Sequence, residues 1–558
     1  MTAFVCALTD KRAYKFSKSC DKKVALYSNL NIMNLCSRYS NLNIEVVRVS
    51  SSSRARITVI GLLLGLLIVS LDQTILSTAV PTIVAKLGGF EQYVWLFSAY
   101  LIASVACMPL FGKLSDMYGR KRFYMLGIIV FMVGSALCGM AGSMQELIWY
   151  RAIQGIGGGA LMPVVFTILF DIFPEGKRAK MTGMFGAVFG LSSVFGPMAG
   201  AFFSDHLHWR WIFYVNLPLG LIALLLVMLG YRETLSFKKQ RIDWLGTFTL
   251  VAAILCFMFG LEMGGKDYAW SSPTIISLFA GALLMFVLFI IVEMKVQEPV
   301  VPLGLFKSKL FTASMGAGLL IGMLLMAGAT FIPLFIQGVV GGSATNASTV
   351  LTPMMLALVC STVTAGFLLR KMSFRSIMLI SGTLLLLSVV LLSQVTPDTS
   401  MSTMIVYMIM MGLGIGASFP VTSIAAQHKV DYQQRGTVNS LVRFFQTLGN
   451  TLGISILGSI QTSYLRDRFG GVLTDPKLVE QLGNPQVLLQ DQVRSSIPEP
   501  ILKQLTSVLS DSIAHVYAWS IPIAVLSLLF ILLMGRVTMM SKHSHGSAAA
   551  AEQGGEPA

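Results

Sequence analysis

Long apolar segments separated by short polar ones are the feature of this sequence that most limits how it can fold. Of its 558 residues, 54% are hydrophobic and only 12% are charged. A soluble domain carries about 25% charged residues, so this chain has too few charges to cover a surface that faces water. We therefore expect an all-α membrane protein, because an open strand in lipid would leave backbone groups without hydrogen-bond partners.

Fourteen of these apolar segments are long enough to cross a hydrocarbon core of about 30 Å as helices. They lie at residues 57–83, 93–112, 123–142, 146–170, 180–204, 211–230, 244–263, 274–293, 311–336, 347–368, 374–395, 402–426, 437–460 and 515–535. Residues 1–56 are polar and show no helical stripe, so we expect a polar cytoplasmic tail there, although the natural start could also lie downstream, for instance at Met33. A second tail is expected at 536–558, and the polar segment 461–514 is expected to be an external loop.

Basic residues are spread unevenly over the loops, which predicts the orientation in the membrane. Every second loop is basic, as in Lys113 and Arg120 to Arg122, whereas the short loops between hold only Lys86, Arg210 and Lys266. Positive loops stay in the cytoplasm, so both termini are predicted to be cytoplasmic in a multi-pass protein of a cell membrane, most simply a bacterial plasma membrane. The net charge of +15 is explained by this topology, and no stacking aromatics or known module indicate nucleic-acid binding.

One loop is far more ordered in sequence than topology requires. Residues 112–122 read Gly-Lys-Leu-Ser-Asp-Met-Tyr-Gly-Arg-Lys-Arg, with Gly112 at the helix exit, Asp116 four residues on, and Gly119, Arg120, Lys121 and Arg122 after it. This pattern resembles the loop between the second and third helices of the major facilitator superfamily.

Three further motifs resemble the drug:proton antiporters of that superfamily. Leu71-Asp72 to Pro81 is similar to their first-helix motif, and Leu147 to Arg151 with Gln154 is similar to their fourth-helix motif. Their fifth-helix motif is matched at Gly183, Gly196, Pro197 and Gly200, with Ser192 and Ala201 in place of two usual glycines. Residues 209–220 are typical of the fourteen-helix branch.

The resemblance implies a fold and a function. The fold would be a six-helix bundle at 57–230, two inserted helices at 243–293 and a second six-helix bundle at 310–535, each bundle built from inverted repeats with substrate bound between them. The function would be export of hydrophobic or amphipathic drugs by alternating access in exchange for protons, with small hydrophobic or cationic molecules as substrates. Asp116 would lock one state, and we expect it to lie against the N-terminus of the helix at 437–460, whose positive end favours an acid.

The positions of Asp72 and Arg151 in the membrane indicate a functional role independently of the resemblance. Asp72 lies about 22 Å along its helix, in the outer half of the membrane, where an unpaired carboxylate is costly. Burial favours the protonated form of a carboxyl group, which suits proton exchange, although a purely structural hydrogen bond is the alternative. Arg151 enters its helix from outside to a similar depth and cannot readily lose its proton, so it would bias a neighbouring acid or serve as an anchor.

Other polar residues inside the apolar segments are weaker candidates for a cavity lining. They are Gln154, Glu262, Gln337, Arg443 and Gln446. No pattern for ATP binding, for a metal site or for catalysis is present, so we expect a non-enzymatic transporter with no cofactor, driven by the proton gradient. The alternatives are a dedicated exporter of a self-made metabolite, lipid or siderophore, an importer, and a membrane sensor or scaffold that transports nothing.

Overall fold

Helices account for nearly all of the regular structure in the computed structural model. It describes residues 32–88, 92, 95–172, 175–233, 243–265, 268–297, 299–341, 344–428, 430–431, 434–472 and 499–538. The elements are α2 (Ile32–Leu87), α3 (Trp95–Tyr118), α4 (Arg120–Met140), α5 (Met144–Ile172), α6 (Glu175–His206), α7 (Trp211–Tyr214), α8 (Asn216–Gly230), α9 (Trp244–Met263), α10 (Pro273–Glu293), the short 3-10 helix η4 (Leu303–Lys307), α11 (Lys309–Gly338), α12 (Ala344–Leu368), α13 (Phe374–Leu392), α14 (Met401–Gly416), α15 (Ser418–Ala426), α16 (Arg435–Val472) and α19 (Glu499–Leu533). The chain divides into a unit of residues 1–57 and a unit of residues 58–558.

Each of the fourteen predicted apolar segments contains a helix. Twelve stretches of the described residues are long and apolar enough to cross a membrane. The other two predicted segments lie in α6 and α16, which run for 32 and 38 residues. The all-α fold class predicted from the sequence is confirmed, while fourteen as the number of membrane crossings stays a prediction.

Local sequence sets where several helices begin. Serine side chains accept a hydrogen bond from a backbone N–H of the first turn at α10, α11, α13 and α14, and Asp243 does so at α9. Such caps satisfy backbone donors that have no partner within the helix. Two predicted segments are each divided into two helices, at Val215 between α7 and α8 and at Ala417 between α14 and α15.

Two predictions about irregular segments are wrong. The expected loop 461–514 is helical at both ends, because α16 continues to Val472 and α19 already begins at Glu499. Leu465 of α16 and Leu505 and Leu509 of α19 are fully buried in one apolar cluster, so these helix ends have a face to pack although their average composition is polar. Residues 32–56 belong to the expected polar tail at 1–56, which shows no helical stripe in sequence, yet they are helical within α2; residues 1–31 lie outside the described part of the chain.

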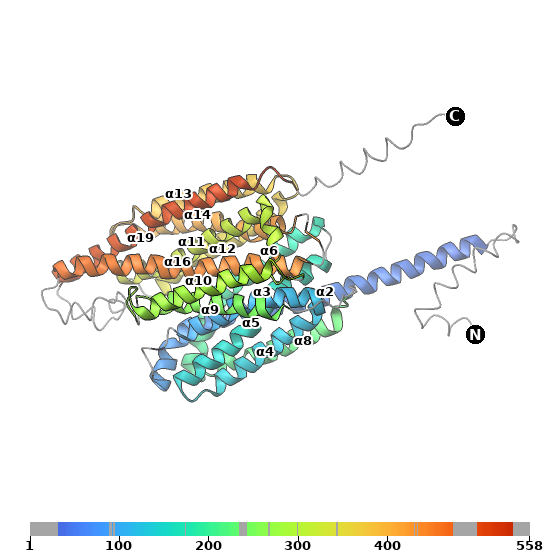
Figure 1. The fold of residues 1–558 in the computed structure, drawn as a ribbon, viewed down its shortest axis with the longest axis horizontal. Helices are drawn as coiled ribbons and strands as arrows, with labels where there is room; N and C mark the ends of the chain where they lie inside the picture. Colours follow the sequence, from blue (N-terminus) through green and yellow to red (C-terminus); the bar gives the residue numbers. More distant parts are fainter. Residues whose placement is uncertain are drawn as a thin grey trace. The chain divides into compact units, whose positions relative to one another are not determined.

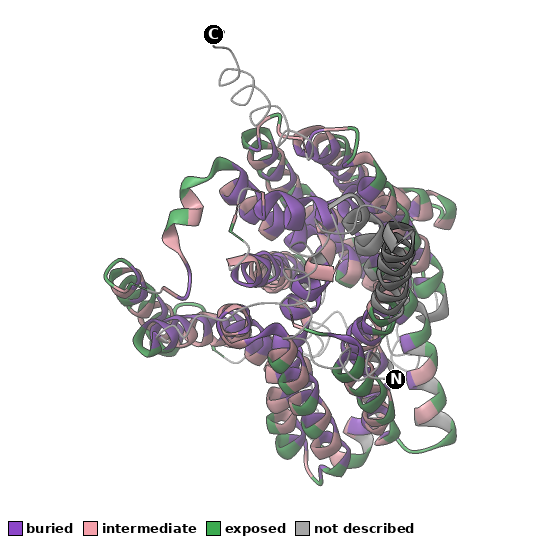
Figure 2. Cartoon of the chain, turned by 90° about the vertical axis from the view of Figure 1, so that its right-hand side faces the viewer, coloured by how far each residue is buried: buried purple, intermediate pink, exposed green. Residues whose placement is uncertain are grey.

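Within the second unit, the helices pack with their buried residues toward one another and their apolar outer faces exposed (Figures 1 and 2). α16 contacts α3, α5, α11 and α19, and α12 contacts α6, so helices from the first and last parts of the chain meet directly (Figure 1). Among the twelve apolar stretches, that of α10 is the most exposed, with 17% of its residues buried. α10 packs against α9, which in turn contacts α3. The exposed leucines of α10 would face lipid, as expected of inserted peripheral helices.

Candidate functional site

A fully buried polar cluster surrounds Asp72 of α2. Arg151 of α5 donates from Nη1 to Asp72 Oδ2 at 2.5 Å, Gln154 donates to Asp72 Oδ1 at 2.8 Å, and Asn216 of α8 donates to the same oxygen at 3.1 Å. All four side chains are at most 1% exposed. Arg151 also donates from Nη1 to Gln154 Oε1 and from Nε to the carbonyl of Leu96. The structure thus brings together the two ionisable residues that the sequence placed at similar depths.

Small residues let the helices that carry this cluster approach one another. A Cβ atom at Gly134 of α4 would lie 2.6 Å from the Cα atom of Gln154, and one at Gly155 would lie 2.9 Å from the Cα atom of Tyr100. Such distances are too short for any side chain, so glycine is required where α5 crosses α3 and α4. These close approaches hold Arg151 and Gln154 in reach of Asp72.

Tyr100 of α3 lies between this cluster and a neighbouring cavity. The guanidinium carbon of Arg151 is 4.6 Å from the centre of the Tyr100 ring, which is a cation–π distance. The Tyr100 hydroxyl is buried without a hydrogen-bond partner, and the residue also lines the cavity. One side chain therefore contacts both the charged cluster and the cavity.

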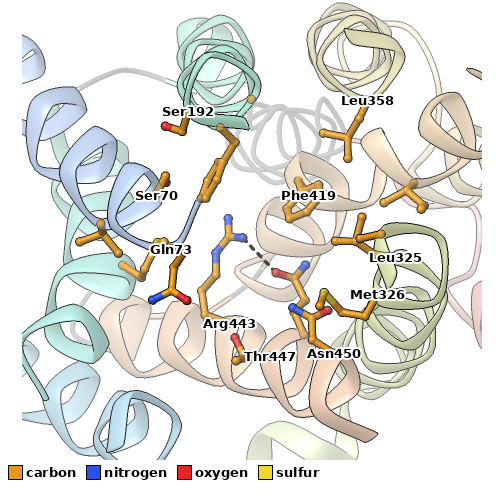
Figure 3. Close-up of a pocket in the computed structure, with 18 of the residues that line it drawn as sticks. Ser70, Gln73, Ser192, Leu325, Met326, Leu358, Phe419, Arg443, Thr447 and Asn450 are labelled. Atoms are coloured by element: carbon orange, nitrogen blue, oxygen red, sulfur yellow. Dashed lines mark hydrogen bonds between the residues drawn. The ribbon is translucent and has the colours of Figure 1, made fainter. Parts of the chain in front are cut away.

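The cavity has a volume of about 340 Å³ and is lined by both parts of the chain. Residues of α2, α3, α5 and α6 line one side, and residues of α11, α12, α14, α15 and α16 line the other. Figure 3 shows Ser70, Gln73 and Ser192 from the first group opposite Leu325, Met326 and Leu358 from the second. Ligand pockets of small molecules have volumes of this order and similar mostly apolar walls.

Arg443 of α16 points into this cavity (Figure 3). It donates to Gln446 Oε1 at 3.0 Å, and its guanidinium carbon lies 3.9 Å from the centre of the Phe166 ring, on α5. Both Arg443 and Gln446 were predicted to line a cavity, and the structure places them there. Gln154, Glu262 and Gln337 were predicted as well, but these three described residues are not part of the lining. Gln154 turns instead toward Asp72.

A second charged network lies where α3 ends and α16 begins. The two carboxylate oxygens of Asp116 accept hydrogen bonds from the backbone N–H groups of Gly436, at 3.0 Å, and Thr437, at 2.8 Å. These groups belong to the first turn of α16, whose positive end attracts an acid. The sequence placed Asp116 against this helix terminus, and the contact is present; its role as a lock stays a prediction. Asp116 itself lies in the last turn of α3 rather than in a loop.

Arg120 connects this network to the rest of the first half. Its guanidinium forms ion pairs with Asp116, at 2.9 Å, and with Asp171 of α5. Its backbone N–H donates to Glu233, which also lies against Gly119, a residue whose φ of 114° favours glycine. Burial raises the pKa of Glu233, and the hydrogen bonds donated by the backbone of Arg120 and Lys121 oppose that rise in part.

The remaining predicted motif residues lie in ordinary helical positions. Lys121 donates to the carbonyls of Met228 and Tyr231, which ties α4 to the end of α8, and Arg122 follows it in α4. Gly183, Gly196, Pro197 and Gly200 all lie in α6. A Cβ atom at Gly196 would lie 2.6 Å from the Cβ atom of Thr74, and Thr74 donates to the carbonyl of Ser192, so α6 packs closely against α2 beside Asp72.

Sequence reasoning missed several residues at these sites, among them Gln73, Tyr100 and Glu233. Gln73 adjoins Asp72 and lines the cavity, Tyr100 joins the cavity to the cluster, and Glu233 binds the backbone next to Arg120. Gln73 could have been predicted from the sequence, because it directly follows Asp72. Tyr100 and Glu233 carry no such signal, because their roles depend on which helices become neighbours.

The sequence is similar to a known family and to named proteins over most of its length. The sequence profile described as Major Facilitator Superfamily matches residues 62–454. A Bacillus subtilis protein named Multidrug resistance protein 3 is 44% identical over 87% of this chain and 96% of its own length. The Bacillus subtilis Multidrug transporter protein MdtP is 36% identical over 88% of this chain and 95% of its own length.

Solved structures resemble the fold at much lower sequence identity. The human organic anion transporter MFSD10 matches with a TM-score of 0.54 and 15% identity, over 84% of this chain and 99% of its own. A bacterial homologue of the lysosomal transporter Spinster, in an inward-facing and occupied conformation, matches with a TM-score of 0.53 and 15% identity, over 86% of this chain and 96% of its own. At this identity the likeness concerns the fold alone.

Proposed function

The chain belongs to the major facilitator superfamily, and from this premise we propose that it exports hydrophobic or amphipathic drugs from the cell by alternating access, in exchange for protons. One observation carries the proposal: the buried Asp72–Arg151 pair and the central cavity share Tyr100. A proton site and a substrate site that share a side chain can influence each other without a long path between them.

Two lines of support concern the direction and the substrates. Both Bacillus subtilis relatives carry names that refer to multidrug resistance or multidrug transport. The cavity surface is mostly apolar and includes three leucines, four methionines and three phenylalanines, which suit varied apolar molecules better than one polar metabolite. Sequence identity to these relatives extends over nearly their whole length, so the proposal concerns the whole transporter.

The proposed coupling works through the charge of Asp72. In the structure Asp72 accepts hydrogen bonds from Arg151, Gln154 and Asn216, an arrangement that stabilises a carboxylate. A proton on Asp72 would remove the attraction to Arg151, which would then shift relative to Tyr100 at the cavity wall. Substrate and proton would thereby favour different states of one equilibrium and compete without touching each other.

Alternating access requires contacts that form in one state and break in the other. Asp116 binds the backbone at the start of α16, and Asn439 of α16 donates to Thr167 of α5 at 3.1 Å, so this end of the interface between the two parts of the chain is joined in the structure. We assign these contacts to the state whose cavity is closed toward the cytoplasm. Opening toward the cytoplasm would break them.

The orientation is part of the proposal. The basic loops support an orientation in which the end of the protein that carries Asp116 lies in the cytoplasm, together with both termini of a multi-pass protein of the cell membrane. A tag after residue 558 and a single cysteine introduced at one position within 475–495 should be labelled from opposite sides of the membrane. Labelling from the same side would contradict the orientation and with it the direction of transport.

Proton coupling is tested directly in inverted membrane vesicles. The full-length chain is expressed in a bacterial host that lacks its own major drug exporters, and respiration acidifies the interior of the inverted vesicles. We expect the addition of a transported drug to dissipate part of this gradient, and collapse of the gradient by an uncoupler to stop drug accumulation. Drug accumulation that continues at full rate without a gradient would refute proton coupling.

A further inference from the structure

Arg443 is a buried cation without an acidic partner among the described residues. It is 6% exposed, its Nη2 atom has no hydrogen-bond partner, and its one polar side-chain contact is the neutral Gln446. No Asp or Glu of the described part of the chain forms a salt bridge with it. A guanidinium group keeps its proton under almost all conditions, so the site holds a positive charge.

The cavity in front of Arg443 provides no counter-charge. Of the described residues that line the cavity, Arg443 is the one that carries a charge. Asp72 is not part of this lining and already binds Arg151. A buried charge without a partner is unfavourable by several kcal/mol, and an incoming group of opposite charge would remove that penalty. The stacking of the guanidinium on Phe166, at 3.9 Å, compensates for only part of it.

Other unused donors face the same space. The Gln73 Nε2 atom and the Tyr100 hydroxyl are both buried without hydrogen-bond partners, and both residues line the cavity with Arg443. Figure 3 shows Gln73 on the neighbouring helix beside the base of Arg443, with Thr447 and Asn450 on the same helix as the arginine. The free donors of this part of the cavity therefore suit a ligand group that accepts hydrogen bonds.

We infer that Arg443 forms an anion subsite of the substrate cavity, and that the preferred ligands are amphipathic organic anions or zwitterions whose carboxylate or sulfonate binds Arg443 while an apolar body fills the rest. The inference rests on the proposed function, because it names the substrate class of the same cavity. A planar guanidinium binds such groups through paired hydrogen bonds. Lipophilic cations, which the sequence alone left open, would meet the same positive charge and bind less well.

A matched set of ligands tests this subsite on the purified full-length protein. 2-Naphthaleneacetate, 2-naphthaleneethanol and (2-naphthyl)ethyl-trimethylammonium share one apolar body and differ in charge. Their dissociation constants are measured by isothermal titration calorimetry in a neutral detergent. A charge-assisted hydrogen bond is stronger than a neutral one, so we expect the anion to bind about tenfold or more tightly than the alcohol, and the cation more weakly than the alcohol.

Variants of one residue separate the charge from the fold. Arg443→Gln should lower the affinity for the anion about tenfold or more and change that for the alcohol by no more than about twofold. Arg443→Lys should retain part of the preference, because the charge remains while the paired geometry is lost. Arg370→Gln, which removes an exposed arginine, is the control that should leave all three affinities unchanged. Binding of the alcohol shows that each variant is folded.

Three outcomes would overturn the inference. They are equal affinity of the wild-type protein for the three ligands, absence of measurable binding of the anion, and an anion preference that survives in Arg443→Gln. A preference for the anion that depends on Arg443, combined with no drug export in vesicles, would instead uphold the subsite and refute the proposed function.

Discussion

Two buried arginines, one in each half of the molecule, differ in what surrounds them. Arg151 in the first half binds the carboxylate of Asp72, the amide of Gln154 and the carbonyl of Leu96. Arg443 in the second half has one amide oxygen, two aromatic rings and an open cavity. Both side chains are at least 94% buried, so the difference lies in their partners and not in their access to water.

The comparison indicates a division of labour between the halves. The charge of Arg151 is balanced within the protein, so it can respond only to a change in its own partner, such as protonation of Asp72. The charge of Arg443 is balanced by nothing among the described residues and is available to a ligand. In the proposed mechanism the Asp72–Arg151 pair would respond to protons, and Arg443 would be available to the substrate.

The largest effect is expected from Asp72→Asn, which removes the titratable group and keeps its size. If Asp72 couples protons to export, active export should fall to near background while expression, folding and binding of a neutral ligand persist. Asp72→Glu should keep part of the activity because the proton site remains. A purely structural Asp72 predicts the reverse, with Asn tolerated and Glu disruptive. Drug accumulation in vesicles distinguishes the two patterns.

The two arginines should also differ in how much each contributes to the stability of the protein. Arg151→Gln leaves the buried Asp72 without its counter-ion, and loss of one partner of a buried pair costs about 3–5 kcal/mol, so the thermal midpoint of the purified protein should fall clearly. Arg443→Gln removes a charge that has no acidic partner, so its midpoint should be unchanged or higher. The midpoints are read from intrinsic tryptophan fluorescence on heating. An equal fall in both variants would refute the distinction between a balanced and an unbalanced charge.

Asp116→Asn should slow transport while leaving ligand affinity nearly intact. The residue lies at the end of α3, outside the cavity lining, so it can only shift the balance between conformations. We expect a decrease of about tenfold in export rate, equivalent to about 1.4 kcal/mol. Rate and affinity are measured on the same preparation in liposomes and in detergent. Loss of ligand binding with the fold intact would mean that Asp116 contributes to the cavity after all.

The smallest effect is expected from Asn216→Ala. It removes one of the three donors to Asp72, at 3.1 Å, and leaves Arg151 and Gln154 in place. A hydrogen bond of this kind contributes about 1 kcal/mol, so export should fall by about fivefold at most. Complete loss of export would show that the cluster acts as one unit, in which no single donor is dispensable.

Much of the fold and part of the site followed from the sequence. Apolar length located a helix in every predicted segment, because a membrane-spanning helix must be both long and apolar. The extensions of α16 and α19 were missed for the same reason: Leu465, Leu505 and Leu509 are buried on one face of otherwise polar helices, and an average over the segment conceals such a face. Hydropathy also does not detect the division of a helix at Ala417.

Within the site, depth along a helix was enough to pair Asp72 with Arg151, since two charges at one level of the membrane tend to meet. The side of each helix that faces the cavity was not predictable. Gln154 and Arg443 both looked like candidates for the lining, yet one turns to Asp72 and the other to the cavity. That choice depends on the rotation of α5 and α16 against their neighbours, which is set by packing between distant parts of the chain.

The contact of Asp116 with α16 determines which substitutions this part of the chain can tolerate. Asp116 accepts hydrogen bonds from two backbone N–H groups, which every residue except proline provides, and also from the Arg120 guanidinium and, at 3.3 Å, from the Thr437 hydroxyl. Thr437 is 1% exposed, so it should accept only residues of similar or smaller size, whereas a Cβ atom at Gly436 would lie 2.7 Å from Cγ of Asp116 and is excluded. A saturation scan scored by drug survival should show two intolerant positions facing each other, Asp116 and Gly436, beside a Thr437 that accepts small residues.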